Sequence, residues 1–277
     1  MFYRIMLSLT VVLGTSVLAW VGSPPSAAAE EYAGKLWPAS DLVSIDRIGH
    51  DAFDGLLKTY VDDDGMVNYK AWHANATDRA TLKSYLEFLS RVDLKLPASR
   101  EAKLAFWINA YNALTLEGIL RVYPTTSIRK HTAKLVGYNI WKNLLLQVGD
   151  QKVSLEHIEH QILRPMNEPS IHFAIVCASI GCPRLLNEAY VADRLGAQLV
   201  TNSTDFFARS QNLQVDRRGN LKLSQIIKWY GEDFGKSSQD QIRALTPYFP
   251  QSAQAIISSG RYSIKYLDYD WNLNAQR

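Results

Sequence analysis

Residues 99–122 read SREAKLAFWINAYNALTLEGILRV, and this stretch decides the fold class. Apolar side chains fill most positions over residues 104–120, so a helix formed here has almost no polar face. A helix that is apolar all round is buried inside a protein. Ser99 is a favoured N-cap residue, and Pro124 disfavours helical geometry in the residue before it. The stretch therefore predicts a central, buried helix.

Short strands are expected on both sides of this helix in the sequence. Leu144–Val148 and Lys152–Val153 flank a Gly-Asp turn, and two triplets with apolar residues at both ends, 213–215 and 221–223, flank a second turn. The apolar run Ile171–Ser179 is rich in β-favouring residues and predicts a strand buried on both faces. We therefore expect an α+β fold, a helix-rich single domain with a central buried helix packed on a small, mostly antiparallel sheet.

Composition places the chain among globular proteins. It has 277 residues, of which 47% are hydrophobic, and this is enough apolar material for a sizeable core. The formal net charge is +3, and the basic residues are scattered along the chain. This balance gives no reason to expect a nucleic-acid partner. Residues 30–277 are expected to form the one domain.

Residues 1–29 have the pattern of a secretory signal peptide. Arg4 supplies a basic start, residues 5–21 are mostly apolar, and Ser26-Ala27-Ala28-Ala29 offers small residues for cleavage before Glu30. The alternative is an uncleaved membrane anchor, since the apolar run is close to spanning length. We expect cleavage, a periplasmic or secreted product, and no transmembrane span in the mature chain.

The two cysteines lie close to a histidine. His172, Cys177 and Cys182 fall within or just after the predicted strand, which makes Cys177 a candidate nucleophile and His172 its base. Strand alternation argues against this pair, because residues five apart point to opposite faces. In an oxidising compartment, Cys177 and Cys182 can instead form a small-loop disulfide, or both can remain inert thiols.

Polar residues on helices complete the candidate site. Asn109 and Asn112 share a face of the buried helix, where an amide either bonds loop backbone or orients His172 or a substrate carbonyl. Glu159 is a further catalytic candidate. Glu156 and His160 share a face that resembles half of a metal site, but a solvated charged face is commoner, so no metal is expected. No dinucleotide or phosphate-binding motif indicates a cofactor.

The combined motifs resemble the DUF547 family of uncharacterised proteins, as in its exported bacterial members. The resemblance runs through most of residues 30–277 and rests on FWINAYNAL (106–114), Ser154-Leu155, His172-Phe173-Ala174, Cys182-Pro183, WYGEDF (229–234) and YLDYDWNL (266–273). The family name carries no established activity. A weaker similarity to transglutaminase-like and papain-like cysteine folds implies a degenerate member that binds without cleaving, because the central helix here carries asparagines and no cysteine.

Two functional hypotheses follow. The first is a thiol/His-type hydrolase or transferase of the cell envelope that acts on amide or peptide bonds, with Cys177 or a water as nucleophile, His172 as base and Asn109 or Asn112 as the orienting group. The second is a non-catalytic periplasmic module that binds an envelope peptide, glycan or protein. An enzyme is expected to expose His172 in a cleft beside the asparagines, whereas a binding module is expected to bury and fully bond these groups.

Overall fold

The long helix α4, Arg100–Val122, forms the centre of the molecule. The computed structural model describes residues 30–133 and 138–277; the predicted signal peptide lies outside the described residues. Ser99 caps α4 by accepting a hydrogen bond from the backbone N–H of Ala102, as predicted. Seventeen of its residues are buried, from Ala102 to Leu120. The prediction of a central, buried helix is confirmed.

Three helices cover one side of α4, and they are α1 (Asp51–Tyr60), α2 (Tyr69–Ala74) and α3 (Ala76–Leu89). Two shorter helices follow α4 in the sequence: α5 (Ile140–Asn143) and α6 (Leu155–His157). A π-helical turn, Ile158–Leu163, continues α6. No helix in the described ranges is long and apolar enough to cross a membrane.

The strands form two sheets, where one mostly antiparallel sheet was predicted. In the first sheet, β2 (Leu144–Val148) pairs antiparallel with β3 (Gln151–Ser154) and parallel with β1 (Glu31–Ala33). In the second, β5 (Leu221–Leu223) pairs antiparallel with β4 (Leu213–Val215) and parallel with β6 (Ile264–Tyr266). Both predicted hairpins are present. The predicted helix-rich α+β fold is confirmed, with two small sheets in which a distant third strand pairs parallel with each hairpin.

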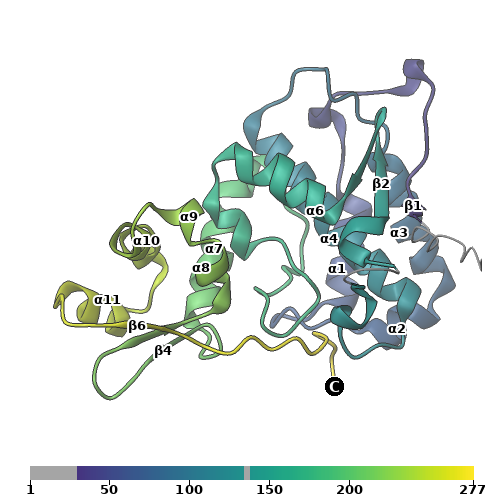
Figure 1. Cartoon of the computed structure of the whole chain (residues 1–277). Helices are drawn as coiled ribbons and strands as arrows, with labels where there is room; N and C mark the ends of the chain where they lie inside the picture. The colour runs from purple at the N-terminus through teal and green to yellow at the C-terminus, as the bar shows by residue number, and fades with distance from the viewer. Residues whose placement is uncertain (1–29, 134–137) are drawn as a thin grey trace, which may run out of the picture.

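The structure has two apolar cores. The first surrounds α4, and the second lies beside it. The second core is formed by α7 (Leu195–Ala208), α8 (Gln225–Trp229), α9 (Gly231–Phe234), α10 (Ser238–Leu245) and α11 (Gln251–Ser258) with the second sheet. Phe173 packs in this core, while its neighbours in the chain, Ile171 and Ala174, belong to the first. The C-terminal tail runs from β6 back to the first core, where the N–H of Leu273 donates to the carbonyl of Thr126 at 2.9 Å (Figure 1).

The predicted strand over 171–179 is wrong. Residues Pro169–Phe173 form a 3-10 helix, and the chain then continues as a buried loop. The reason is that a side chain supplies the backbone partners of this loop. Asn112 Nδ2 donates to the carbonyl of Ala174 at 3.0 Å, and its Oδ1 accepts from the N–H of Val176 at 3.0 Å. An apolar run can therefore be buried here without a strand beside it.

Asn109 makes the same kind of clamp one turn earlier on α4. Its Nδ2 donates to the carbonyl of Tyr190 at 2.8 Å, and its Oδ1 accepts from the N–H of Tyr190 at 2.9 Å. Both asparagines are about 1% exposed, so these bonds have no competition from solvent. Of the two roles considered for these amides, the structure shows the one in which they bond loop backbone.

Replacing Asn109 with leucine is therefore expected to destabilise the fold. Two buried backbone groups of Tyr190 lose their partners, and each such loss costs about 1–3 kcal/mol. We expect Asn109→Leu to lower the free energy of unfolding by about 3 kcal/mol in urea denaturation. The matched control is Asn272→Leu, at an exposed position. Equal stability of the two variants would contradict the structural role of Asn109.

Candidate functional site

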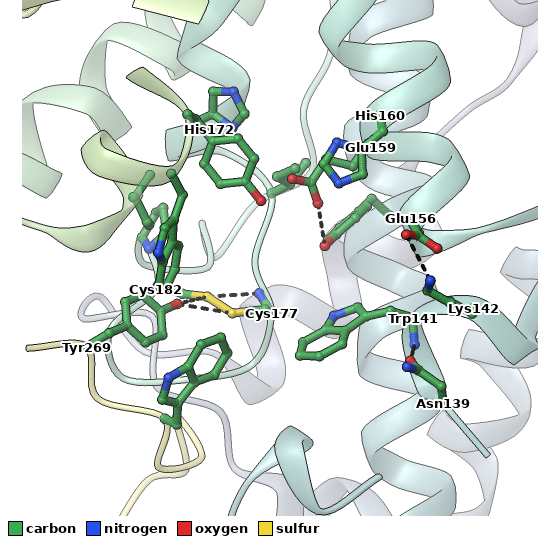
Figure 2. Close-up of a pocket in the computed structure, with 17 residues that line it drawn as sticks. Asn139, Trp141, Lys142, Glu156, Glu159, His160, His172, Cys177, Cys182 and Tyr269 are labelled. Carbon is green, nitrogen blue, oxygen red and sulfur yellow. Dashed lines mark hydrogen bonds and ion pairs between the residues drawn. A yellow bond between two sulfur atoms is a disulfide. The ribbon is translucent and has the colours of Figure 1, made fainter. Parts of the chain in front are cut away.

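A cavity of about 390 Å³ opens between the two apolar cores. Its walls come from α4, α5, the α6 region, the loop after His172, α8 and the C-terminal tail. In Figure 2, Glu159 and Trp141 lie on one side of the cavity, and the Cys177–Cys182 disulfide with Tyr269 lies on the other. The wall also includes Tyr111, Asn139, Lys142, Glu156, His160, His172, Trp229, Tyr230 and Trp271.

His172 is held by an acid and an aromatic ring. Its Nε2 lies 2.7 Å from Asp233 Oδ2, and its ring stacks on Tyr230 with centroids 4.1 Å apart. Burial lowers the pKa of His172, although the hydrogen bond to Asp233 acts to raise it. The ring is therefore neutral near pH 7 and donates its Nε2 proton to Asp233. Its side chain is only 1% exposed, so the imidazole is sealed into the wall.

Asp233 is fixed by a bidentate arginine. Arg164 Nε and Nη2 donate to the two carboxylate oxygens at 2.7 and 2.8 Å. Burial acts to raise the pKa of Asp233, but the hydrogen bonds from Arg164 and His172 outweigh it and hold that pKa below its usual value. Asp233 thus stays ionised and links α9 to the helical turn that carries Arg164. The sequence motif around Trp229 placed this acid among aromatics but did not identify its partners.

Glu159 lies buried at the cavity wall and accepts a tyrosine hydroxyl. Tyr111 donates to its Oε2 at 3.2 Å, and Tyr230 lines the same cavity. Burial raises the pKa of both tyrosines, with the Glu159 charge adding to the effect. Both phenols therefore stay protonated and act as donors. Glu159 is 8% exposed, so the cavity contains a carboxylate that is largely removed from solvent.

Glu156 and His160 lie nearer the solvent and are paired with cations. Glu156 Oε1 lies 3.3 Å from Lys142 Nζ, and His160 Nδ1 lies 3.2 Å from Arg164 Nη1. Within residues 30–133 and 138–277, no three histidine, cysteine, aspartate or glutamate side chains are grouped to hold a metal ion. These two side chains instead contribute polar groups to the cavity wall.

Aromatic rings form a continuous part of the wall. The rings of Trp229, Tyr269 and Trp271 contact one another, with centroids 4.4 to 5.9 Å apart. Trp141, from α5, lies edge-on to Trp271 at 6.3 Å. Trp229 is 45% exposed, so part of its ring faces solvent. These aromatics were seen in the sequence, but only the return of the tail to α8 and α5 places them together.

Cys177 and Cys182 form a disulfide in the cavity wall. Of the three states considered for the cysteines, the structure therefore contains the disulfide, and Cys177 has no thiol to act as a nucleophile in this state. Strand alternation was expected to separate His172 from Cys177. Both line one cavity instead, because the segment between them is not a strand.

The candidate residues thus divide into two groups. His172, Cys177 and Glu159 line the cavity, whereas Asn109 and Asn112 lie behind it and hold the backbone of its loops. Residues that the sequence did not single out as a site include Tyr111, Tyr230 and Tyr269. The signal for them was the aromatic content of the motifs around positions 106–114, 229–234 and 266–273.

Stability is expected to fall as the pH drops from 7 to 5. Burial lowers the pKa of His172 in the folded chain, so the unfolded chain, with the usual pKa of 6.5, binds a proton there more readily and acid favours unfolding. Burial also lowers the pKa of His50, to about 4, and adds to the effect. We expect His172→Gln to lose less stability over this range than the parent in urea denaturation. His157→Gln, at an exposed position, is the control and should follow the parent.

Comparison with known proteins agrees with the motifs quoted above. The family model described as "Protein of unknown function, DUF547" matches residues 96–207, which include α4, the first hairpin, the His172 loop and all of α7 except its last residue. No curated protein and no solved structure matched the chain. The match confirms the resemblance to the DUF547 family over residues 96–207.

Proposed function

We propose that this protein is an exported binding module, without thiol/His hydrolase activity, that takes a saccharide in the aromatic cavity. The observation that carries the proposal is the composition of the cavity wall. The rings of Trp141, Trp229, Tyr269 and Trp271 and the buried carboxylate of Glu159 line one cavity of about 390 Å³. This volume falls within the usual range for small-ligand pockets, and such pockets combine apolar walls with a few placed polar groups.

A saccharide fits this wall for chemical reasons. A sugar ring has C–H faces that pack against aromatic rings and a rim of hydroxyls that donate and accept hydrogen bonds. The aromatic group supplies the first kind of contact. Glu159, Glu156 and Lys142 supply acceptors and donors for the second. Because Glu159 is 8% exposed, a hydroxyl that bonds to it displaces little solvent and gains a charge-assisted hydrogen bond.

The same geometry favours binding over catalysis by the proposed thiol mechanism. A Cys–His hydrolase needs a free thiol and an accessible imidazole. Cys177 is bonded to Cys182, and the His172 side chain is 1% exposed and hydrogen-bonded to Asp233. The asparagines are buried and bonded to loop backbone. These groups therefore match the pattern expected of a binding module.

Export is the second element of the proposal. The apolar run of residues 5–21 and the small residues before Glu30 support a cleaved signal peptide. A disulfide persists in oxidising compartments, and the bond between Cys177 and Cys182 is compatible with one. The module would then meet glycans and peptides of the cell envelope.

Removing one exposed ring should weaken binding while preserving the fold. We expect a β-1,4-linked N-acetylglucosamine tetrasaccharide to change the tryptophan fluorescence of the protein. We also expect Trp229→Ala to raise the dissociation constant on the order of tenfold in calorimetry, because a stacking contact of about 1 kcal/mol or more is lost. Trp37→Ala is the matched control, since Trp37 lies outside the cavity wall.

Cellotetraose and maltotetraose serve as further probes in the same titration, because they present the same kind of C–H face with different hydroxyls and linkages. Glu159→Gln should weaken whichever saccharide binds, since an acceptor oxygen becomes a donor. The proposal would be wrong if none of the three saccharides bound the parent protein, or if Trp229→Ala and Trp37→Ala bound with equal affinity.

Cleavage of the signal peptide has a direct readout. We expect intact-mass spectrometry of the protein recovered from its own cell envelope to give a chain that begins at or near Glu30, because Ala27 and Ala29 satisfy the small-residue pattern of the cleavage site. The control is the same gene expressed without residues 2–29, which should remain in the cytoplasm. Recovery of the uncleaved chain in the membrane fraction would instead support the anchor alternative.

A further inference from the structure

The disulfide in the cavity wall is surrounded by hydrogen-bond donors. Cys182 Sγ accepts from the backbone N–H of Cys177 at 3.0 Å and from the Tyr269 hydroxyl at 3.1 Å, and the Ser179 hydroxyl lies 3.4 Å away. The two hydroxyls also lie 3.2 Å from Cys177 Sγ and 3.0 Å from each other. Burial raises the pKa of Tyr269, so its phenol keeps the proton that it donates.

This donor set suits a thiolate better than a disulfide. A disulfide sulfur carries no charge and is a weak acceptor, whereas hydrogen bonds to an ionised acceptor are about twice as strong as neutral ones. The backbone N–H of Cys177 is directed at Cys182 Sγ, so the donors converge on Cys182 more than on Cys177. The surroundings therefore stabilise the reduced form, with the charge on Cys182, and make the bond easier to reduce.

The accessibility of the two sulfurs agrees with this assignment. Cys177 is half-buried, while Cys182 is 7% exposed, and both line the cavity. Exchange is favoured when the accessible sulfur is attacked and the better-stabilised sulfur leaves. An incoming thiolate in the cavity would reach Cys177. Cys182 would then leave as a thiolate that its hydrogen-bond donors stabilise.

The loop between the cysteines is also held without the disulfide. The N–H of Ile180 donates to the carbonyl of Asn272 at 2.9 Å, and the N–H of Gly181 donates to the carbonyl of Asp270 at 2.8 Å. Ser179 forms a bridge to Leu273 on the same tail. A disulfide between residues five apart adds little stability where the loop is already held by hydrogen bonds, since disulfides that close long loops stabilise a fold most. Reduction can therefore proceed with the fold in place.

We propose that Cys177–Cys182 is a thiol–disulfide exchange site that opens into the cavity and takes a thiol as its substrate. A substrate thiolate attacks Cys177 Sγ, the Cys177–Cys182 bond breaks, and Cys182 leaves as the thiolate. A second thiolate then attacks the substrate sulfur of the mixed disulfide and releases Cys177. Two thiols become one disulfide and lose two electrons and two protons, which the protein disulfide takes up as it becomes a dithiol.

The test is a redox titration of the mature, exported protein in glutathione buffers, with thiols trapped by alkylation and counted by mass spectrometry. We expect the folded protein to be half reduced within the range of these buffers, with near-ultraviolet circular dichroism unchanged. Tyr269→Phe should shift the equilibrium about tenfold toward the disulfide, because the thiolate loses a charge-assisted hydrogen bond. Ser179→Ala should shift it in the same direction by less.

Tyr266→Phe is the matched control, because Tyr266 is 37% exposed on the same tail and lies outside the cavity wall. It should titrate with the parent. Acid quenching during reduction should show glutathione attached to Cys177. The proposal is overturned if the folded protein stays oxidised at every glutathione ratio, if Tyr269→Phe and Ser179→Ala both titrate with the parent, or if the adduct forms on Cys182. No saccharide is present, so failure of saccharide binding leaves this test unaffected.

Discussion

The bonds from the α4 side-chain amides to buried loop backbone are the constraint on which the rest of the structure depends. A buried backbone group without a partner costs about as much as a lost hydrogen bond, and the loop after His172 runs through the interior without a sheet to satisfy it. Asn112 fills that need at Ala174 and Val176. The loop is thereby fixed against α4, and the side chains at its two ends, His172 and Cys177, reach the same cavity.

A second set of contacts joins the two apolar cores through charge. Arg164 follows the helical turn that carries Glu159, whereas Asp233 lies on α9 in the other core. Arg164, Asp233 and His172 form one hydrogen-bonded chain in which each group satisfies the next. The ionised carboxylate of Asp233 depends on Arg164, because removing this cation would leave a charge without compensation. The cavity lies where these three hydrogen-bonded side chains and the C-terminal tail join the two cores.

Burial also sets the chemistry that the cavity wall presents. It raises the pKa of Tyr111, Tyr230 and Tyr269, so that three phenols remain donors. Tyr111 donates to Glu159, and Tyr269 donates to the disulfide. The wall therefore combines hydroxyl donors, one buried carboxylate and exposed aromatic faces. This combination supports both the proposed saccharide binding and the proposed exchange chemistry in one cavity, and Tyr269 takes part in both (Figure 2).

The sequence by itself determined the elements whose signals are local. The cap at Ser99, the apolar length of α4 and the turns of both hairpins each depend on residues within a few positions of one another. It also placed His172, Cys177 and Glu159 among the candidates. Only the tertiary structure decided that 171–179 is a loop, that Asn109 and Asn112 are supports, and that Tyr269 meets the disulfide. The physical reason is distance along the chain: the partners of Asn112 lie 62 and 64 residues away, and Tyr269 lies 90 from Ser179. Such hydrogen bonds leave no periodic trace in the sequence, and they form only once packing has brought their partners together.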